Sequence, residues 1–161
     1  MSKIIKVGMA DANVCVAPDA ITTLGLGSCV GIVLYDPVGK IAGLAHIMLP
    51  DSTKIFNNSN KYKFADTAID LLIVDMLKIG ANRYNLVAKI AGGAQMFNFG
   101  SGTEMMRIGE RNVEATKEKL AQLGIKILAE DTGANYGRTI EFYPETGLLH
   151  VKAVGRALKI I

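Results

Sequence analysis

Short runs rich in valine, isoleucine and alanine recur through the first half of the chain, and residues that favour turns separate them. Runs of about four to eight such residues between turn signals predict β-strands, because an amphipathic helix needs a longer stretch with a different spacing. The sequence therefore predicts strands at residues 4–8, 13–17, 29–35 and 41–49, arranged as an antiparallel sheet.

The last two of these strands flank the segment Asp36-Pro37-Val38-Gly39-Lys40. Proline presets a turn dihedral and glycine supplies a positive one, so the two strands should form a hairpin. If its loop has an even number of residues, Gly31 lies opposite His46 and Cys29 lies opposite Met48. Cys29 and His46 are then diagonal neighbours on one face, with Cα atoms roughly 7 to 8 Å apart. An odd loop or a bulge would separate them.

Two later segments carry apolar residues at helical spacing. They cover residues 64–79 and 112–123, and each pattern stops at a glycine, Gly80 or Gly124. The polar stretch 50–63 should form a mobile loop before the first helix. Further strands are predicted at residues 86–91, 125–129, 138–143 and 148–154. We expect one domain, residues 1–161, with a mixed sheet and two main helices.

Charge and hydropathy exclude several classes of function. The chain has 18 basic and 15 acidic residues, a net charge of +3, and the basic residues are scattered, which argues against nucleic acid as a partner. Charged residues interrupt the most apolar segment, 64–79, which is shorter than the roughly 20 residues of a membrane span. The N-terminus lacks the apolar region of a secretory signal. These features predict a cytoplasmic protein without membrane insertion.

The two cysteines and two histidines are too few, at unsuitable spacing, for a structural zinc site, and we expect neither a metal nor another cofactor. A reducing cytosol disfavours a disulfide between Cys15 and Cys29. Cys15 alternates with Val14 and Val16, so it should be a core residue. His150 lies in an alternating strand and should be a surface or packing residue.

A glycine-rich segment leads into the other cysteine: Thr22-Thr23-Leu24-Gly25-Leu26-Gly27-Ser28-Cys29-Val30-Gly31. We interpret it as a turn that presents the Cys29 thiol at the end of a strand. Backbone N–H groups in such a turn favour the thiolate and can receive an oxyanion. His46 is the candidate base, and Thr23, near the start of the turn, can hold its imidazole in the useful tautomer. The set indicates an acyl-transfer nucleophile.

Motifs spread over nearly the whole chain resemble the chemoreceptor glutamine deamidase family, CheD. They are Thr23-Leu24-Gly25-Leu26-Gly27-Ser28-Cys29, Ala45-His46-Ile47-Met48-Leu49-Pro50, Lys61-Tyr62, Lys89-Ile90-Ala91-Gly92-Gly93-Ala94 and Gly109-Glu110-Arg111-Asn112. The resemblance implies a triad in which Cys29 is the nucleophile, His46 the base and Thr23 its orienter. A segment at 131–138 is also similar, although a second glycine is expected where Ala134 stands.

The resemblance implies more than these motifs carry by themselves. The implied fold is α/β (α+β), a three-layer sandwich with a mixed, mainly antiparallel β-sheet and two main helices, similar to the bacterial toxin deamidases. The implied reaction converts selected glutamines of chemoreceptor cytoplasmic helices to glutamate through a cysteine thioester, with release of ammonia. The implied partner is a CheC-type phosphatase. Ser28 and Gly27 become candidate oxyanion donors, and Gly92 and Gly93 should lie near the substrate groove.

Alternative interpretations remain for several features. Gly92-Gly93-Ala94 lacks the continuation of a phosphate-binding loop and the spacing of a dinucleotide fingerprint, so a structural turn is favoured. An apolar cluster is either core or a docking surface for a helical partner; its members are Phe97, Phe99, Met105 and Met106. At the level of function, the alternatives are a non-catalytic module that regulates a CheC-type phosphatase and an amidase or peptidase for small substrates.

Overall fold

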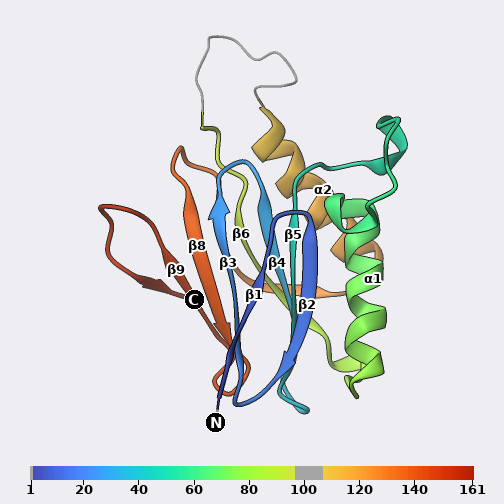
Figure 1. The fold of residues 1–161 in the computed structure, drawn as a ribbon, viewed down its shortest axis with the longest axis vertical. Helices are drawn as coiled ribbons and strands as arrows, with labels where there is room; N and C mark the ends of the chain where they lie inside the picture. Colours follow the sequence, from blue (N-terminus) through green and yellow to red (C-terminus); the bar gives the residue numbers. More distant parts are fainter. Residues whose placement is uncertain (1, 97–106) are drawn as a thin grey trace.

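The computed structural model describes residues 2–96 and 107–161 (Figure 1). The cluster predicted at Phe97, Phe99, Met105 and Met106 lies outside the described residues. Within them, one sheet has the order β1-β3-β8-β9-β10, and a second has the order β2-β5-β4-β6-β7. The strands of the first sheet are β1 Ile4–Val7, β3 Ala20–Leu26, β8 Arg138–Tyr143, β9 Leu148–Lys152 and β10 Lys159–Ile160. Those of the second are β2 Asp11–Val16, β5 Ile41–Ile47, β4 Val30–Asp36, β6 Val87–Gly92 and β7 Lys126–Thr132.

The helices and sheets form three layers. Helices α1 (Ala65–Lys78) and α2 (Ile108–Gln122) lie on the same side of the sandwich, as Figure 1 shows. Apolar residues of α1, such as Leu72 and Met76, pack with Ile32 and Ala45 of the second sheet. The opposite face of that sheet packs against the first sheet, for example through Phe142. The predicted fold class, α+β with two main helices and mixed, mainly antiparallel strands, is confirmed.

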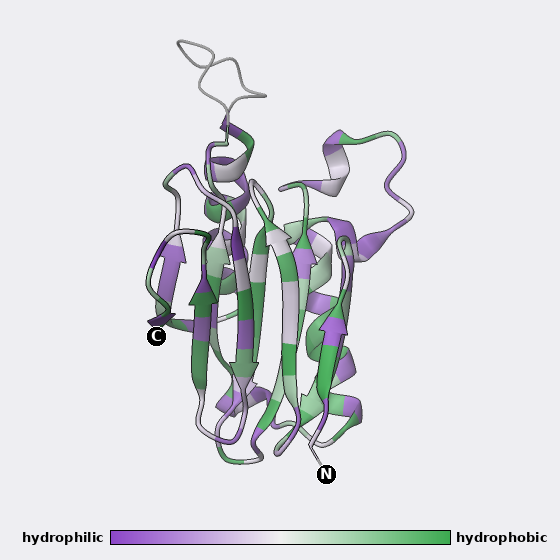
Figure 2. Cartoon of the chain, turned by 60° about the vertical axis from the view of Figure 1, so that its left-hand side comes forward, coloured by the Kyte–Doolittle hydropathy of each residue, from purple (hydrophilic) through white to green (hydrophobic). Residues whose placement is uncertain are grey.

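Strands β4 and β5 form the centre of the molecule, and every residue of both is buried. A layer covers each face of these strands, which explains why they are almost continuously apolar instead of alternating. In Figure 2 the hydrophobic colour predominates along strands in the middle of the sandwich. The predicted hairpin is present, with Asp36 paired to Ile41 and Gly31 paired to His46. The register expected from an even loop is therefore confirmed.

The segment around Thr23 departs from the prediction. It was expected in a turn, but β3 extends from Ala20 to Leu26 and pairs with β1 on one side and β8 on the other. A register shift between Thr23 and Leu26 accommodates Gly25, whose φ is +72°. Pairing on both sides thus overrides the local turn signal of two glycines. The single mixed sheet predicted from the strand pattern is also wrong, because the strands divide between two stacked sheets.

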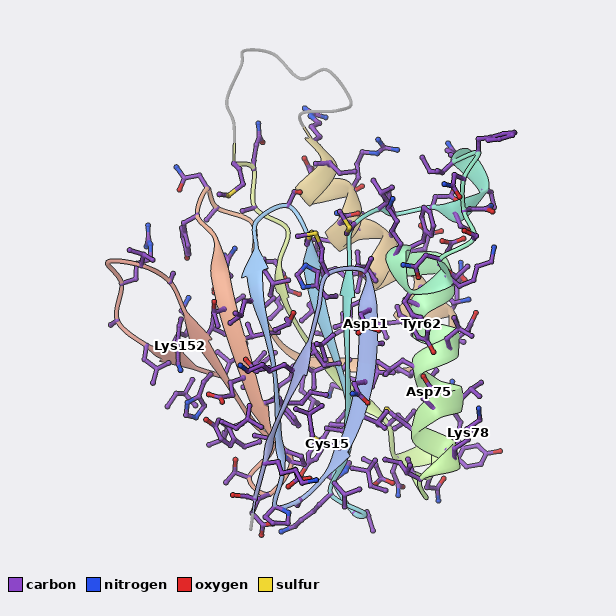
Figure 3. The ribbon with its side chains drawn as sticks, viewed as in Figure 1. Asp11, Cys15, Tyr62, Asp75, Lys78 and Lys152 are labelled. Carbon is purple, nitrogen blue, oxygen red and sulfur yellow. The ribbon has the colours of Figure 1, made fainter. Side chains whose placement is uncertain are left out.

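Hydrogen bonds connect the loop before α1, residues 50–63, to that helix. It contains the 3-10 helices η1 (Ser52–Lys54) and η2 (Lys61–Lys63), and a third, η3 (Arg83–Asn85), follows α1. The Ser52 hydroxyl donates to Asp66 of α1 at 2.7 Å. The Tyr62 hydroxyl donates to Asp75 of the same helix at 2.8 Å, and both residues are labelled in Figure 3. These hydrogen bonds hold the loop along α1.

The structure tests four smaller predictions, which concern the start of α2, Cys15, His150 and Ala134. Helix α2 begins at Ile108, before the predicted start at residue 112. Glycine has low helix propensity, so Gly109 gives no sequence signal for a helix, but in the fold it lets the first turn of α2 lie tightly against Gly93. Cys15 is buried in the core as predicted. His150 packs its ring against Tyr143, with centroids 4.7 Å apart. Ala134 has a φ of +59°, the left-handed conformation in which glycine is the usual residue.

Candidate active site

The β4–β5 hairpin brings Cys29 and His46 to one face. Cys29 immediately precedes β4, and Val30, the first residue of that strand, pairs with Ile47. Residues two apart in a strand face the same side, so the Cys29 side chain lies on the face that Gly31 borders. Gly31 pairs with His46, so the His46 side chain lies on that face too. This face packs against the first sheet, since Cys29 belongs to the cluster between the two sheets. Cys29 is 8% exposed and His46 is 1% exposed.

Gly31 lets the two sheets pack closely beside this pair. A Cβ at position 31 would lie 2.6 Å from Ile140 and 3.1 Å from Leu26, both of the facing sheet. A side chain at position 31 would require Ile140 and Leu26 to repack at the level of His46. The glycine therefore permits the close approach that brings His46 to β3.

Thr23 of the facing sheet determines the tautomer of His46. The Thr23 hydroxyl lies 2.7 Å from His46 Nδ1 and donates to the carbonyl of Val7 at 2.8 Å. A carbonyl oxygen only accepts, so the single hydroxyl proton of Thr23 is committed to Val7 and its oxygen accepts from Nδ1–H. Neutral His46 therefore carries its proton on Nδ1 and a lone pair on Nε2.

The Nε2 atom of His46 is buried and has no hydrogen-bond partner among the described residues. Burial also lowers the pKa of His46 below its ordinary value, which keeps the imidazole neutral. A neutral imidazole with a free lone pair on Nε2 can act as a general base.

Burial raises the pKa of the Cys29 thiol, and the backbone N–H of Cys29 opposes this effect in part. The sequence predicted that turn amides would favour the thiolate; the amide does so, but burial outweighs it. In the resting site a neutral thiol and a neutral imidazole therefore lie on the same face of the hairpin. Such a pair generates the thiolate by proton transfer at the moment of reaction.

The turn before Cys29 is held by the Gly92-Gly93 segment. The Gly93 N–H donates to the carbonyl of Cys29 at 2.8 Å, and the Ala94 N–H donates to that of Gly27 at 2.9 Å. Gly92 has a φ of +111°, and a Cβ there would lie 2.3 Å from the Cys29 carbonyl oxygen. Both glycines thus have a structural reason to lack a side chain. Gly93 also lines a cavity of about 330 Å³, together with Gln95, Glu110, Val113, Glu114, Lys117, Thr132, Gly133 and Ala134.

The N–H groups of two candidate site residues, Gly27 and Gly93, are already engaged. The N–H of Gly27 donates to Gly25 at 3.1 Å, and that of Gly93 donates to Cys29. Among the backbone hydrogen bonds that join described residues in turns and loops, none uses the N–H of Ser28 or Cys29 as a donor. The amides at the candidate nucleophile are therefore the ones available to a substrate.

Sequence reasoning missed the role of Asn112, which belongs to α2 and is fully buried. Its side-chain amide donates to the carbonyl of Ser28 at 2.9 Å and to that of Met48 at 3.0 Å. These carbonyls flank Cys29 and the end of the His46 strand. The Gly109-to-Asn112 motif was the available signal, although nothing in its spacing indicates these partners.

The described residues show neither a metal-binding cluster nor a membrane-spanning helix. In the ranges 2–96 and 107–161, no group of three or more His, Cys, Asp or Glu side chains is arranged to hold a metal ion. In the same ranges, no helix has both the length and the apolar character needed to cross a membrane.

A thiol, an imidazole with its proton on Nδ1 and free backbone amides at the end of a sandwich are the groups that cysteine-dependent hydrolases use. The model of the family described as CheD chemotactic sensory transduction matches residues 48–153. A protein of Lachnoclostridium phytofermentans named probable chemoreceptor glutamine deamidase CheD is 67% identical over 161 residues, covering 100% of both chains. The chemoreceptor glutamine deamidase CheD of Halalkalibacterium halodurans is 59% identical over 162 residues, again covering 100% of both. The chain belongs to the CheD family.

A solved structure gives a more distant likeness. The crystal structure of the Bacillus licheniformis hypothetical protein YfiH aligns with 72% of this chain and 47% of its own, at 17% identity and a TM-score of 0.43.

Proposed function

We propose that this chain is a chemoreceptor glutamine deamidase, an amide hydrolase that converts selected receptor glutamines to glutamate. One observation carries the proposal: Thr23 holds the proton of His46 on Nδ1, which leaves Nε2 as an unpaired base on the face that Cys29 shares. The relatives named as chemoreceptor glutamine deamidases match this chain over its whole length and support the substrate class.

The reaction begins with transfer of the Cys29 thiol proton to Nε2 of His46. The thiolate attacks the side-chain amide carbon of the substrate glutamine, and the N–H groups of Ser28 and Cys29 receive the oxyanion. His46 then returns the proton to the leaving nitrogen, and ammonia departs as the thioester forms. Thr23 stabilises the imidazolium by accepting from Nδ1–H throughout.

The second half of the reaction regenerates the thiol. A water molecule attacks the thioester carbonyl and gives a proton to Nε2 of His46. The second tetrahedral intermediate collapses, the C–S bond breaks, and the sulfur recovers the proton from His46. Glutamate and ammonia are the products, and the sum of the steps consumes one water.

The proposed substrate segments are the cytoplasmic helices of chemoreceptors, so the protein would act in the cytoplasm. A CheC-type phosphatase is a further proposed partner, on the strength of the family resemblance. A purely non-catalytic regulator is not favoured, because the relatives are named for the deamidase activity. Binding of such a phosphatase should survive Cys29→Ala, since it needs no nucleophile.

Mass spectrometry of receptor cytoplasmic fragments tests the proposal. Wild-type protein should convert specific glutamines to glutamate with release of ammonia, and Cys29→Ala should abolish the conversion. Cys15→Ala is the matched control, because it also removes a buried thiol from the same cluster but should keep the activity. Full conversion by Cys29→Ala would refute the assignment.

A further inference from the structure

Asn112 is a polar residue at a position where helix α2 faces the sheet. The buried residues of α2 are Gly109, Asn112, Thr116 and Leu120, which form one stripe at helical spacing. Apolar residues are usual in such a stripe. Asn112 instead places an amide group, fully shielded from solvent, against the β4–β5 end that carries Cys29.

The orientation of this amide follows from its partners. Carbonyl oxygens only accept, so Nδ2 must face both Ser28 and Met48. The Oδ1 atom is then buried without a hydrogen-bond partner among the described residues. An unpaired buried acceptor is unfavourable, so the position of Asn112 is explained by what its Nδ2 does.

The bond to Ser28 controls the peptide that joins Ser28 to Cys29. In a planar trans peptide the C=O and the following N–H point in opposite directions. With the Ser28 carbonyl held against α2, the Cys29 N–H is directed away from the helix. The Gly93 N–H holds the next carbonyl, that of Cys29, at 2.8 Å. Two successive peptides at the nucleophile are therefore fixed from outside the turn.

The bond to Met48 acts on the other strand of the hairpin. Val30 pairs with Ile47, so Met48 lies where the paired strands end, level with Cys29 and two residues after His46. One amide group thus joins the backbone before the nucleophile to the backbone after the base. No paired strand residues hold this end together, because the β4–β5 ladder stops at Val30 and Ile47.

We propose that Asn112 is a positioning residue for deamidation: it holds the Ser28–Cys29 peptide so that the Cys29 N–H can receive the oxyanion, and it clamps Cys29 beside His46. This inference rests on the proposed function. It adds a residue from the helix layer to a site whose other members come from the two sheets.

The test compares Asn112→Ala with Thr116→Val. Thr116 is also fully buried, one turn further along α2, and its hydroxyl donates to the Asn112 carbonyl at 2.8 Å. Both variants lose buried hydrogen bonds on one helix, but only the first releases the Cys29 turn. The measurements are the kcat and KM for a receptor fragment, the melting temperature, and the pH profile of Cys29 alkylation in a Cys15→Ala background.

Asn112→Ala should lower kcat about a hundredfold with little change in KM, the loss typical of a misplaced oxyanion donor. Its alkylation profile should move to higher pH, because the Cys29 N–H no longer supports the thiolate. Thr116→Val should lower the melting temperature but leave kcat and the profile unchanged. If Asn112→Ala does not fold, Asn112→Ser should show the same two changes to a smaller degree.

An alkylation profile of the folded Asn112 variant that matches the wild type would overturn the proposal, as would equal losses of kcat in both helix variants. Absence of receptor deamidation by the wild type would instead refute the proposed function. The alkylation profiles would still show whether Asn112 sets the environment of Cys29.

Discussion

The two cysteines occupy contrasting regions of the same cluster between the sheets. Both are buried, and both belong to strands or turns that flank β5. Around Cys15, burial and the nearby charge of Asp19 raise the thiol pKa to about 12. Around Cys29, burial also raises the pKa, but the Cys29 backbone N–H opposes this effect, and His46, whose Nε2 has no partner among the described residues, lies on the same face. Because both thiols are buried, the two regions differ in the arrangement of polar groups around the sulfur and not in burial.

Alkylation of both thiols at pH 8 should show the largest difference between the two cysteines. Cys15 should react at least a hundredfold more slowly than Cys29, because a thiol of pKa about 12 is ionised to only about one part in 10⁴ at that pH. His46→Ala should slow Cys29 about tenfold and leave Cys15 unchanged. Mass spectrometry of the labelled peptides measures both rates in one sample. Equal rates at the two cysteines would contradict the distinction.

The sequence predicts the elements of this region better than their assembly. Turn residues at positions 37–40 specify the hairpin and its register, and apolar spacing specifies both helices. The sandwich is different, because stacking of two sheets leaves no local pattern. Thr23 illustrates this: its strand contains turn-like residues, and it meets His46 only because the sheets face each other. Asn112 contacts carbonyls 84 and 64 positions away, which no spacing rule connects.

A smaller effect should separate two adjacent threonines of β3. The Thr23 hydroxyl contacts His46, whereas the Thr22 hydroxyl donates to the Ile140 carbonyl at 2.6 Å. Thr23→Val should lower kcat about tenfold, since the imidazole loses the acceptor that fixes its tautomer and supports its charged form. Thr22→Val loses a buried hydrogen bond of similar kind and serves as the control.

Deamidation kinetics on a receptor fragment, with melting temperatures for both variants, distinguish these outcomes. Thr22→Val should be destabilised yet retain its kcat. A kcat for Thr23→Val equal to that of Thr22→Val would mean that the contact with His46 is only structural.

The smallest effect concerns stability against pH. Burial holds the pKa of folded His46 below its unfolded value of about 6.5. Below that unfolded value, the unfolded chain binds a proton that the folded chain refuses, so the free energy of unfolding decreases as the pH falls toward the folded pKa. The slope cannot exceed about 1.4 kcal/mol per pH unit for one proton. Above about pH 6.5 the two states bind the same number of protons at this site, and the contribution to the slope vanishes.

Denaturant unfolding of the wild type and His46→Gln between pH 5 and 7 measures this contribution as the difference between their slopes. His46→Gln should flatten the decline toward acid, while Cys15→Ala should keep the wild-type slope, because a thiol of pKa about 12 does not titrate in this window. Parallel curves for wild type and His46→Gln would mean that His46 accepts a proton as readily in the folded chain as in the unfolded one. The neutral resting imidazole on which the contrast between the two cysteines depends would then be wrong.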